Sequence, residues 1–139
     1  MKKLRGILLV DDNDTSNFLN ERLLKRMAIT DEIKILSNGK NAFDYLEKLN
    51  REGKASSETK PELILMDINM PVVDGFEFLE LYQNLDEQFR QDIMVAILST
   101  SNHPQDTSRA KDFNAYYITK PLTIDKVEVL LSRYKVGAE

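Results

Sequence analysis

The sequence predicts an α/β fold in which helices cover both faces of a parallel β-sheet. Five short apolar runs of strand length recur along the chain. They are continuous rather than alternating, which is typical of strands buried on both faces. Segments with a helical spacing of apolar residues separate the runs. Strand and helix therefore alternate five times, the pattern of a doubly wound sheet.

The five predicted strands consist mostly of leucine and β-branched residues, the latter being favoured in strands. They are Ile7–Val10, Ile33–Leu36, 63–66, 93–98 and 115–118. The four prolines, Pro61, Pro71, Pro104 and Pro121, all lie outside these runs. Because proline cannot donate a hydrogen bond to a sheet, their positions support the predicted boundaries.

Five helices are predicted after the strands. The first carries Leu19, Leu23 and Met27 at four-residue intervals, with Asn13 or Asp14 as its N-cap. Three more helices begin near Asn38-Gly39, Asp74-Gly75 and Pro104. The last is expected to be capped by Thr123, and its apolar residues are Ile124, Val127, Leu131 and Tyr134. The segment 104–113 is polar and weakly patterned. The residues from Asn50 to Lys60, rich in charge and serine, are predicted to form an exposed loop.

Composition excludes several classes of function. The chain has no cysteine, which excludes disulfides, thiolate zinc sites and thiol nucleophiles, and its one histidine, His103, is expected to face solvent in a loop. The net charge is −4, and without a basic tract no nucleic-acid binding is predicted. No apolar stretch approaches the roughly 18 residues of a membrane span. The sequence predicts a single-domain cytoplasmic protein that does not bind membranes.

Polar residues follow four of the five predicted strands. They are Asp11 and Asp12 after the first strand, Asp67 after the third, Ser99 and Thr100 after the fourth, and Lys120 after the fifth. The carboxyl ends of parallel strands share one edge of the sheet, and open α/β folds bind ligands at that edge. The sequence therefore predicts one polar site built from these side chains.

The three aspartates of this site would repel one another. Either one of them stays protonated, or a divalent cation neutralises the group. Oxygen ligands without histidine or cysteine favour Mg²⁺ over zinc, and Mg²⁺ usually pairs few carboxylates with a phosphate oxygen. The cluster is therefore suited to hold a phosphoryl group beside Asp67. Lys120 would supply a positive charge to that group, and Ser99 a hydrogen-bond donor.

Taken in order, these residues resemble the receiver domain of two-component response regulators. Asp11-Asp12 resembles its acidic pair, and the segment from Asp67 to Gly75 resembles its phosphoacceptor signature. Lys120-Pro121 resembles its Lys-Pro pair. Ser99 and Tyr117 lie at its hydroxyl and aromatic switch positions. The resemblance extends from about Leu4 to Tyr134.

The resemblance implies a flavodoxin-like sheet of strand order 2-1-3-4-5. It also implies that Asp67 accepts a phosphoryl group from a histidine kinase or a histidine phosphotransfer protein. Asp12, Asp67 and the backbone carbonyl of Asn69 would bind Mg²⁺, and Asp11 would act through a bound water. Lys120 and Ser99 would stabilise the phosphoryl group.

Further roles are implied by the same resemblance. Ser99 and Tyr117 would form the conformational switch, and Asn69 and Ser101 would tune hydrolysis of the phosphoaspartate. No output domain is expected, so the protein would signal by contact with an unknown downstream protein, pass its phosphoryl group onward, or form a homodimer. It would not be an enzyme beyond promoting its own phosphotransfer and dephosphorylation.

Two alternatives remain open at this stage. A phosphatase of the haloacid-dehalogenase type also uses a nucleophilic aspartate with Mg²⁺, but it generally needs a second aspartate two residues later as the general acid. That position here is Asn69, which leaves the leaving group without an obvious proton donor. The other alternative is a degenerate receiver that binds partners without being phosphorylated.

Overall fold

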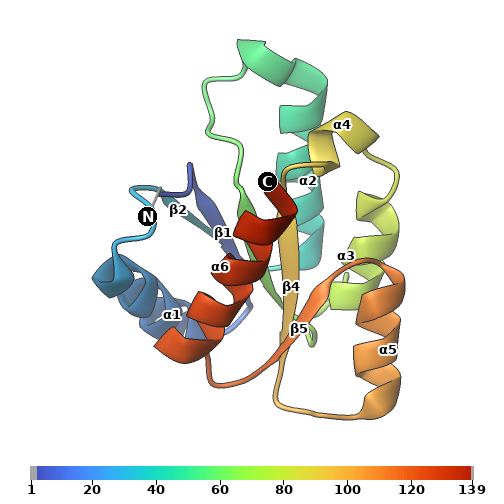
Figure 1. Ribbon diagram of the computed structural model, residues 1–139. Coiled ribbons are helices and arrows are strands. Elements are labelled where there is room, and N and C mark those ends of the chain that lie inside the picture. Colours follow the sequence, from blue (N-terminus) through green and yellow to red (C-terminus); the bar gives the residue numbers. More distant parts are fainter. Residues whose placement is uncertain (1–2, 139) are drawn as a thin grey trace.

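The computed structural model describes residues 3–138, with side chains described up to residue 133. Its centre is a five-stranded parallel sheet of order β2-β1-β3-β4-β5 (Figure 1). The strands are β1 (Ile7–Val10), β2 (Ile33–Leu36), β3 (Leu63–Asp67), β4 (Met94–Ser99) and β5 (Tyr116–Thr119). The predicted alternation and the predicted strand order are both confirmed.

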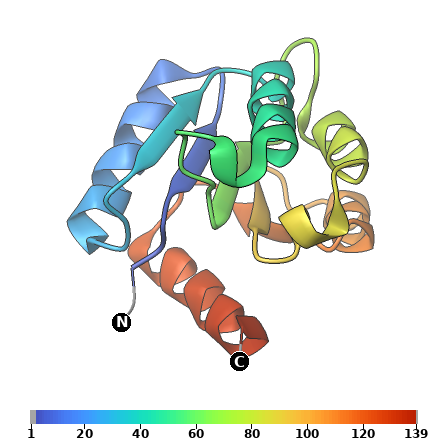
Figure 2. The same cartoon turned by 90° about the horizontal axis from the view of Figure 1, so that it is seen from above.

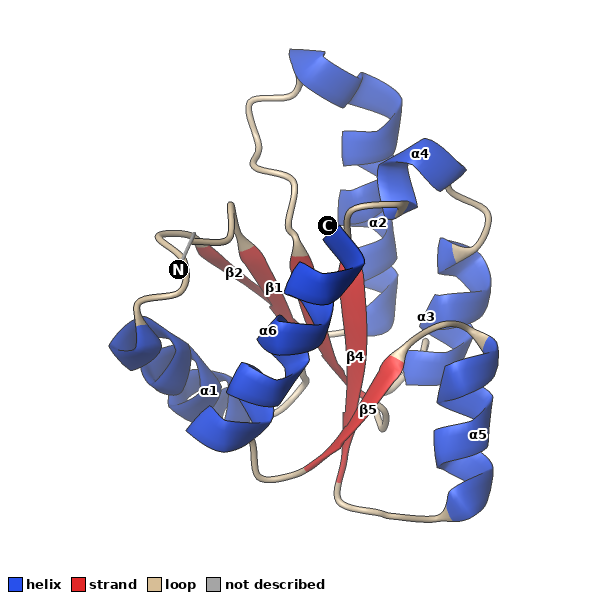
Figure 3. Ribbon diagram, viewed as in Figure 1, coloured by secondary structure: helices blue, strands red, loops and turns tan. Residues whose placement is uncertain are grey.

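Helices cover both faces of the sheet (Figure 2). They are α1 (Asp14–Met27), α2 (Gly39–Glu52), α3 (Gly75–Tyr82), α4 (Glu87–Arg90), α5 (Pro104–Asp112) and α6 (Ile124–Ala138), with a 3₁₀ turn, η1 (Gly53–Ala55) (Figure 3). Alternate strand residues such as Leu8 and Leu9 pack into two separate apolar clusters on opposite faces. The apolar runs of β1, β3 and β4 are buried throughout because both faces are covered, whereas the edge strands β2 and β5 are partly exposed, contrary to the prediction for all five runs. In the described part of the chain, no helix is long and apolar enough to cross a membrane.

The number of helices differs from the prediction. Residues 3–138 contain six helices rather than five, because α4 is a four-residue helix between α3 and β4. A helix of about one turn is too short to show an apolar periodicity. Similarly, α2 and η1 extend to Ala55, so only part of the predicted loop from Asn50 to Lys60 is irregular. This end of α2 is mostly exposed, and its polar residues resemble those of a loop.

The orientation of α1 also differs from the prediction. Its buried positions are Asn17 and Leu24, which are seven residues apart on one face, whereas Leu19 is 55% exposed. The spacing of Leu19, Leu23 and Met27 thus predicted the helix but not the centre of its buried face. The predicted N-cap Asn13 is confirmed, since its side chain accepts a hydrogen bond from the Ser16 N–H. On α6, the predicted apolar residue Tyr134 has a side chain outside the described set.

Gly39 is required where α2 begins beneath the loop that joins β3 to α3. A Cβ atom at this position would collide with the Val73 carbonyl oxygen and would lie 2.9 Å from Val73 Cγ1. We expect Gly39→Ala to lower the free energy of unfolding by about 1–3 kcal/mol, because this backbone contact cannot be relieved by a side-chain rotation. Urea denaturation measures the effect. Gly6→Ala is the control, since its Cβ would approach only to 3.4 Å of the Thr59 methyl group. Equal effects of the two substitutions would contradict this explanation.

Candidate functional site

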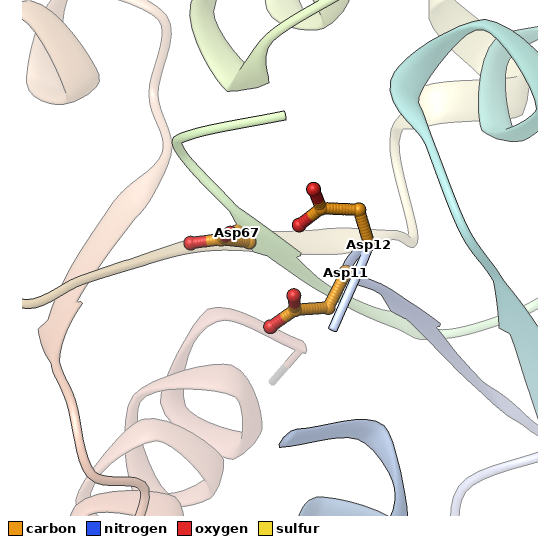
Figure 4. A group of neighbouring side chains, drawn as sticks. All are labelled: Asp11, Asp12 and Asp67. Carbon is orange, nitrogen blue, oxygen red and sulfur yellow. The ribbon is translucent and has the colours of Figure 1, made fainter. Parts of the chain in front are cut away.

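Three aspartate side chains meet at the carboxyl edge of the sheet, as the sequence predicts. Asp11 and Asp12 follow β1, and Asp67 is the last residue of β3. One carboxylate oxygen from each lies within 4.8 Å of the other two, and the side chains extend toward the same side (Figure 4). Asp11 and Asp67 are buried, whereas Asp12 is exposed. The cluster therefore has a buried base and one side open to solvent.

The local backbone holds Asp11 and Asp67 in this arrangement. The Asp11 N–H donates to the Leu36 carbonyl of β2, and Asp11 Oδ1 accepts from the Asn13 N–H at 2.9 Å. Asp67 ends the central strand, and the next residue, Ile68, donates its N–H to the Leu98 carbonyl of β4. Strand pairing therefore sets where both carboxylates enter the site.

Lys120 reaches the same cluster from the loop after β5. Its Nζ lies 3.2 Å from Asp11 Oδ2 and 3.2 Å from Asp67 Oδ1. Its backbone N–H donates to the Ser99 carbonyl at 2.7 Å, which joins this loop to the end of β4. The structure thus brings Lys120 to the two buried carboxylates and leaves Asp12 facing solvent.

The electrostatics of the site favour an added cation. Burial raises the pKa of Asp67 above its ordinary value, and the negative charge of Asp11 raises it further, while Lys120 and the Asn69 N–H oppose this shift. Burial alone would lower the pKa of Lys120, but the charges and hydrogen bonds of Asp67 and Asp11 outweigh it and raise that pKa. Three carboxylates against one ammonium leave a charge of −2 when all are ionised. An all-oxygen site of this charge fits Mg²⁺.

The predicted switch residues lie in one hydrogen-bonded chain. Ser99, the last residue of β4, is buried, and its Oγ accepts from the Ser101 N–H at 3.0 Å. The Tyr117 hydroxyl of β5 donates to the Ser101 carbonyl at 2.6 Å. Tyr117 is half-buried and packs against the apolar cluster of α2, α3 and α5. Ser101 is therefore the link between Ser99 and the aromatic ring.

Two residues near the site have contacts that the sequence did not indicate. His103 is exposed, as predicted, but its Nδ1 also accepts from the Gln105 N–H and so caps α5. Asn17 is buried in α1 and donates from Nδ2 to the Asp11 carbonyl at 2.8 Å. The available signal for Asn17 was a polar residue seven positions before Leu24, on the same helical face.

Sequence comparisons agree with this geometry. The family model for the response regulator receiver domain matches residues 7–132. A probable methanogenesis regulatory protein, FilR2, from Methanothrix harundinacea is 34% identical over 93% of this chain and 80% of that protein. The response regulator Rcp1 from Synechocystis is also 34% identical, over 82% of this chain and 75% of that protein.

Structural comparisons agree as well. A two-component response regulator from Cytophaga hutchinsonii has a TM-score of 0.83 and 31% identity, over 96% of this chain and 98% of that chain. The bacteriophytochrome response regulator RtBRR has a TM-score of 0.74 and 30% identity, over 93% of this chain and 76% of that chain. Because the family match spans the whole sheet and the acidic edge lies where the sequence resemblance implied, this chain belongs to the receiver domains of two-component response regulators.

Proposed function

We propose that Asp67 is the phosphoacceptor of this receiver domain and that a histidine kinase or a histidine phosphotransfer protein is its phosphoryl donor. The observation that carries this proposal is the position of the Asp67 carboxylate, 3.2 Å from Lys120 Nζ and beside Asp11 and Asp12. It is the nucleophile at the end of the central strand, with a fixed positive charge on one side.

The proposed transfer is a displacement at phosphorus. An Asp67 carboxylate oxygen attacks the phosphorus of phosphohistidine and forms a P–O bond. The P–N bond breaks, and its electron pair returns to the imidazole nitrogen of the donor. Lys120 stabilises the negative charge on the transferring oxygens. Burial and Asp11 raise the pKa of Asp67, so its carboxylate is more basic than one exposed to water.

The proposed Mg²⁺ ligands are Asp12, Asp67 and the backbone carbonyl of Asn69, with Asp11 contributing through a water. Mg²⁺, when bound, neutralises charge that develops on the phosphoryl oxygens. Asn69 and Ser101 are exposed at the edge of the site. We expect both to affect how readily water reaches the phosphoaspartate.

Phosphotransfer profiling tests this function. Purified histidine kinases from the same genome, loaded with labelled phosphate, are mixed with the protein. We expect rapid transfer from one or a few of them. Transfer from none of these kinases, together with no uptake from acetyl phosphate, would favour a degenerate receiver. Sustained release of phosphate from a generic phosphatase substrate would instead favour the phosphatase alternative.

We expect phosphorylation to be relayed through Ser101. Phosphorylation adds three strong acceptor oxygens at Asp67, and Ser99 carries the nearest proposed neutral donor. If the Ser99 hydroxyl moves to a phosphoryl oxygen, the Ser101 N–H loses its acceptor, and the Ser101 carbonyl that holds Tyr117 is disturbed. The face formed by α5, β5 and α6 would then carry the contact with a downstream protein or a second copy.

Amide chemical-shift mapping with Mg²⁺ and beryllofluoride, a mimic of the phosphoryl group, tests this relay. We expect shifts around Ser99, around Tyr117 and over residues 110–113. The distant shifts should largely disappear in Ser99→Ala. The matched control is Ser132→Ala, which removes a hydroxyl from α6 that donates only to the Val129 carbonyl. Shifts confined to Asp11, Asp12, Asp67 and Lys120 would contradict the relay.

Three broader expectations complete the proposal. The chain acts as one receiver domain that signals by contact, it works in the cytoplasm, and it promotes no chemistry beyond its own phosphorylation and dephosphorylation. The family membership supports the receiver role itself. Size-exclusion chromatography with and without beryllofluoride would show whether phosphorylation promotes a homodimer.

A further inference from the structure

Asn17 is a buried polar side chain that lies next to the acidic cluster without belonging to it. It is 5% exposed, on the face of α1 that also buries Leu24. Its contact with Asp11 is a hydrogen bond of 2.8 Å to the backbone carbonyl oxygen. Because a carbonyl oxygen only accepts, the amide NH₂ of Asn17 must be the group that donates.

The carbonyl oxygen of this amide does not stabilise the fold. Asn17 Oδ1 is buried and has no hydrogen-bond partner among the described residues. A buried acceptor without a donor destabilises the folded protein. A leucine of similar size has no unpaired polar atom and would avoid that cost. A local requirement at the Asp11 carbonyl therefore accounts for an asparagine here better than packing does.

The Asp11 carbonyl is the group whose position matters for the metal site. It belongs to the planar peptide that joins Asp11 to Asp12, so holding this oxygen also orients the start of Asp12. The Asp11 side chain is held separately, by the Asn13 N–H and by Lys120. In the part of the chain that the structure describes, the exposed Asp12 carboxylate has no hydrogen-bond or ion-pair partner. Its direction therefore depends on the backbone that carries it.

We propose that Asn17 is a positioning residue that aims Asp12 at the metal by holding the Asp11–Asp12 peptide. It touches neither the ion nor the phosphoryl group. This inference rests on the Mg²⁺ site in the proposed function and names a residue of α1 that controls it. Partners that orient metal ligands typically change metal affinity by about 10-fold to 100-fold when they are removed.

The test compares two substitutions on the same helical face in the full chain. In Asn17→Leu, isothermal titration calorimetry should give a Kd for Mg²⁺ about 10-fold higher than in wild type. Its thermal unfolding midpoint without Mg²⁺ should change little, because the unpaired Oδ1 and the donor to Asp11 are lost together. In Leu24→Ala, the midpoint should fall because a buried side chain is truncated, while the Kd stays close to that of wild type.

A spectroscopic measurement separates positioning from stability. In metal-free Asn17→Leu, we expect a changed ¹⁵N shift at Asp12, since the preceding carbonyl loses its donor, with the resonances of β4 and β5 in place. Asn17→Gln, which keeps an amide on a longer side chain, should recover part of the Mg²⁺ affinity. If Asn17→Leu does not fold, the Mg²⁺ affinity of Asn17→Gln, compared with that of wild type, decides the test instead.

The outcomes distinguish this inference from the function on which it rests. Wild-type affinity in Asn17→Leu would overturn the positioning role and leave the metal site intact. Equal loss of Mg²⁺ affinity in Leu24→Ala would also overturn it, because the effect would then follow stability. If wild-type protein itself binds no Mg²⁺, the proposed metal site fails first.

Discussion

Asp67→Asn is expected to take up no phosphoryl group. After incubation with acetyl phosphate and Mg²⁺, intact-mass spectrometry should show one added phosphoryl group on wild-type protein and none on the variant. An amide is a far weaker nucleophile than a carboxylate. We expect no transfer to the neighbouring Asp11, to which the proposed function gives only a water-mediated role at the metal.

The control for this experiment is Asp14→Asn. It makes the same chemical change at an exposed residue in the first turn of α1, close to the site in sequence but outside the acidic cluster. It should be phosphorylated like wild type. A full-occupancy adduct on Asp67→Asn would show that another residue is the acceptor.

Asp67→Asn should also be more stable than wild type at neutral pH. Burial and then Asp11 raise the pKa of Asp67 above its ordinary value of 3.8, even with the attraction of Lys120 included. The folded protein therefore binds this proton more tightly than the unfolded chain does, and ionisation of Asp67 lowers stability. This penalty is absent below the unfolded-state pKa and complete above the raised folded-state pKa.

Urea unfolding in EDTA at neutral and acidic pH measures this effect. The stability advantage of Asp67→Asn should be present at pH 7 and should shrink as the pH falls toward 3.8, where wild-type Asp67 is itself protonated. A variant less stable than wild type at pH 7 would indicate that the pairing with Lys120 outweighs the repulsion from Asp11.

Asp12→Ala is expected to weaken Mg²⁺ binding by more than about 10-fold. Loss of a residue that only hydrogen-bonds to a metal ligand already lowers metal affinity by about 10-fold or more, and Asp12 is itself a proposed ligand. Mg²⁺ keeps several waters and takes few protein ligands, so each carboxylate contributes a large share of the affinity. Asp12 is also the exposed carboxylate of the cluster, and the structure shows no internal cation that neutralises it among the described residues.

Calorimetric titration with Mg²⁺ measures this loss, and Asp14→Ala is its control. Asp14 carries the same charge two residues later, in the first turn of α1, so it reports how much of the effect is general electrostatic attraction. Asp67→Asn should also weaken binding, but part of that loss is offset because a repelling carboxylate is removed. Unchanged affinity in Asp12→Ala would place the ion elsewhere.

Much of the fold could be predicted because its causes are local. Strands covered on both faces must be apolar throughout, so the runs at Ile7–Val10 and 63–66 identified a parallel sheet before any contact was known. Parallel strands end at the same edge, so Asp11, Asp67 and Lys120 could be assigned to one site from their positions alone. The order of the strands came from the resemblance to a family and not from these residues, because an apolar run does not record which strands lie beside it.

Other features were decided only by tertiary packing. Apolar spacing predicted α1, but contact with the sheet set which side is buried, and this placed Asn17 rather than Leu19 inside. The link from Ser99 through Ser101 to Tyr117 joins residues of β4, its following loop and β5, and local sequence does not encode the distances between strands. The chain by itself determined which chemical groups reach the edge of the sheet. Packing between distant segments decided which of them touch, because a side chain's partners depend on neighbours that its own periodicity cannot report.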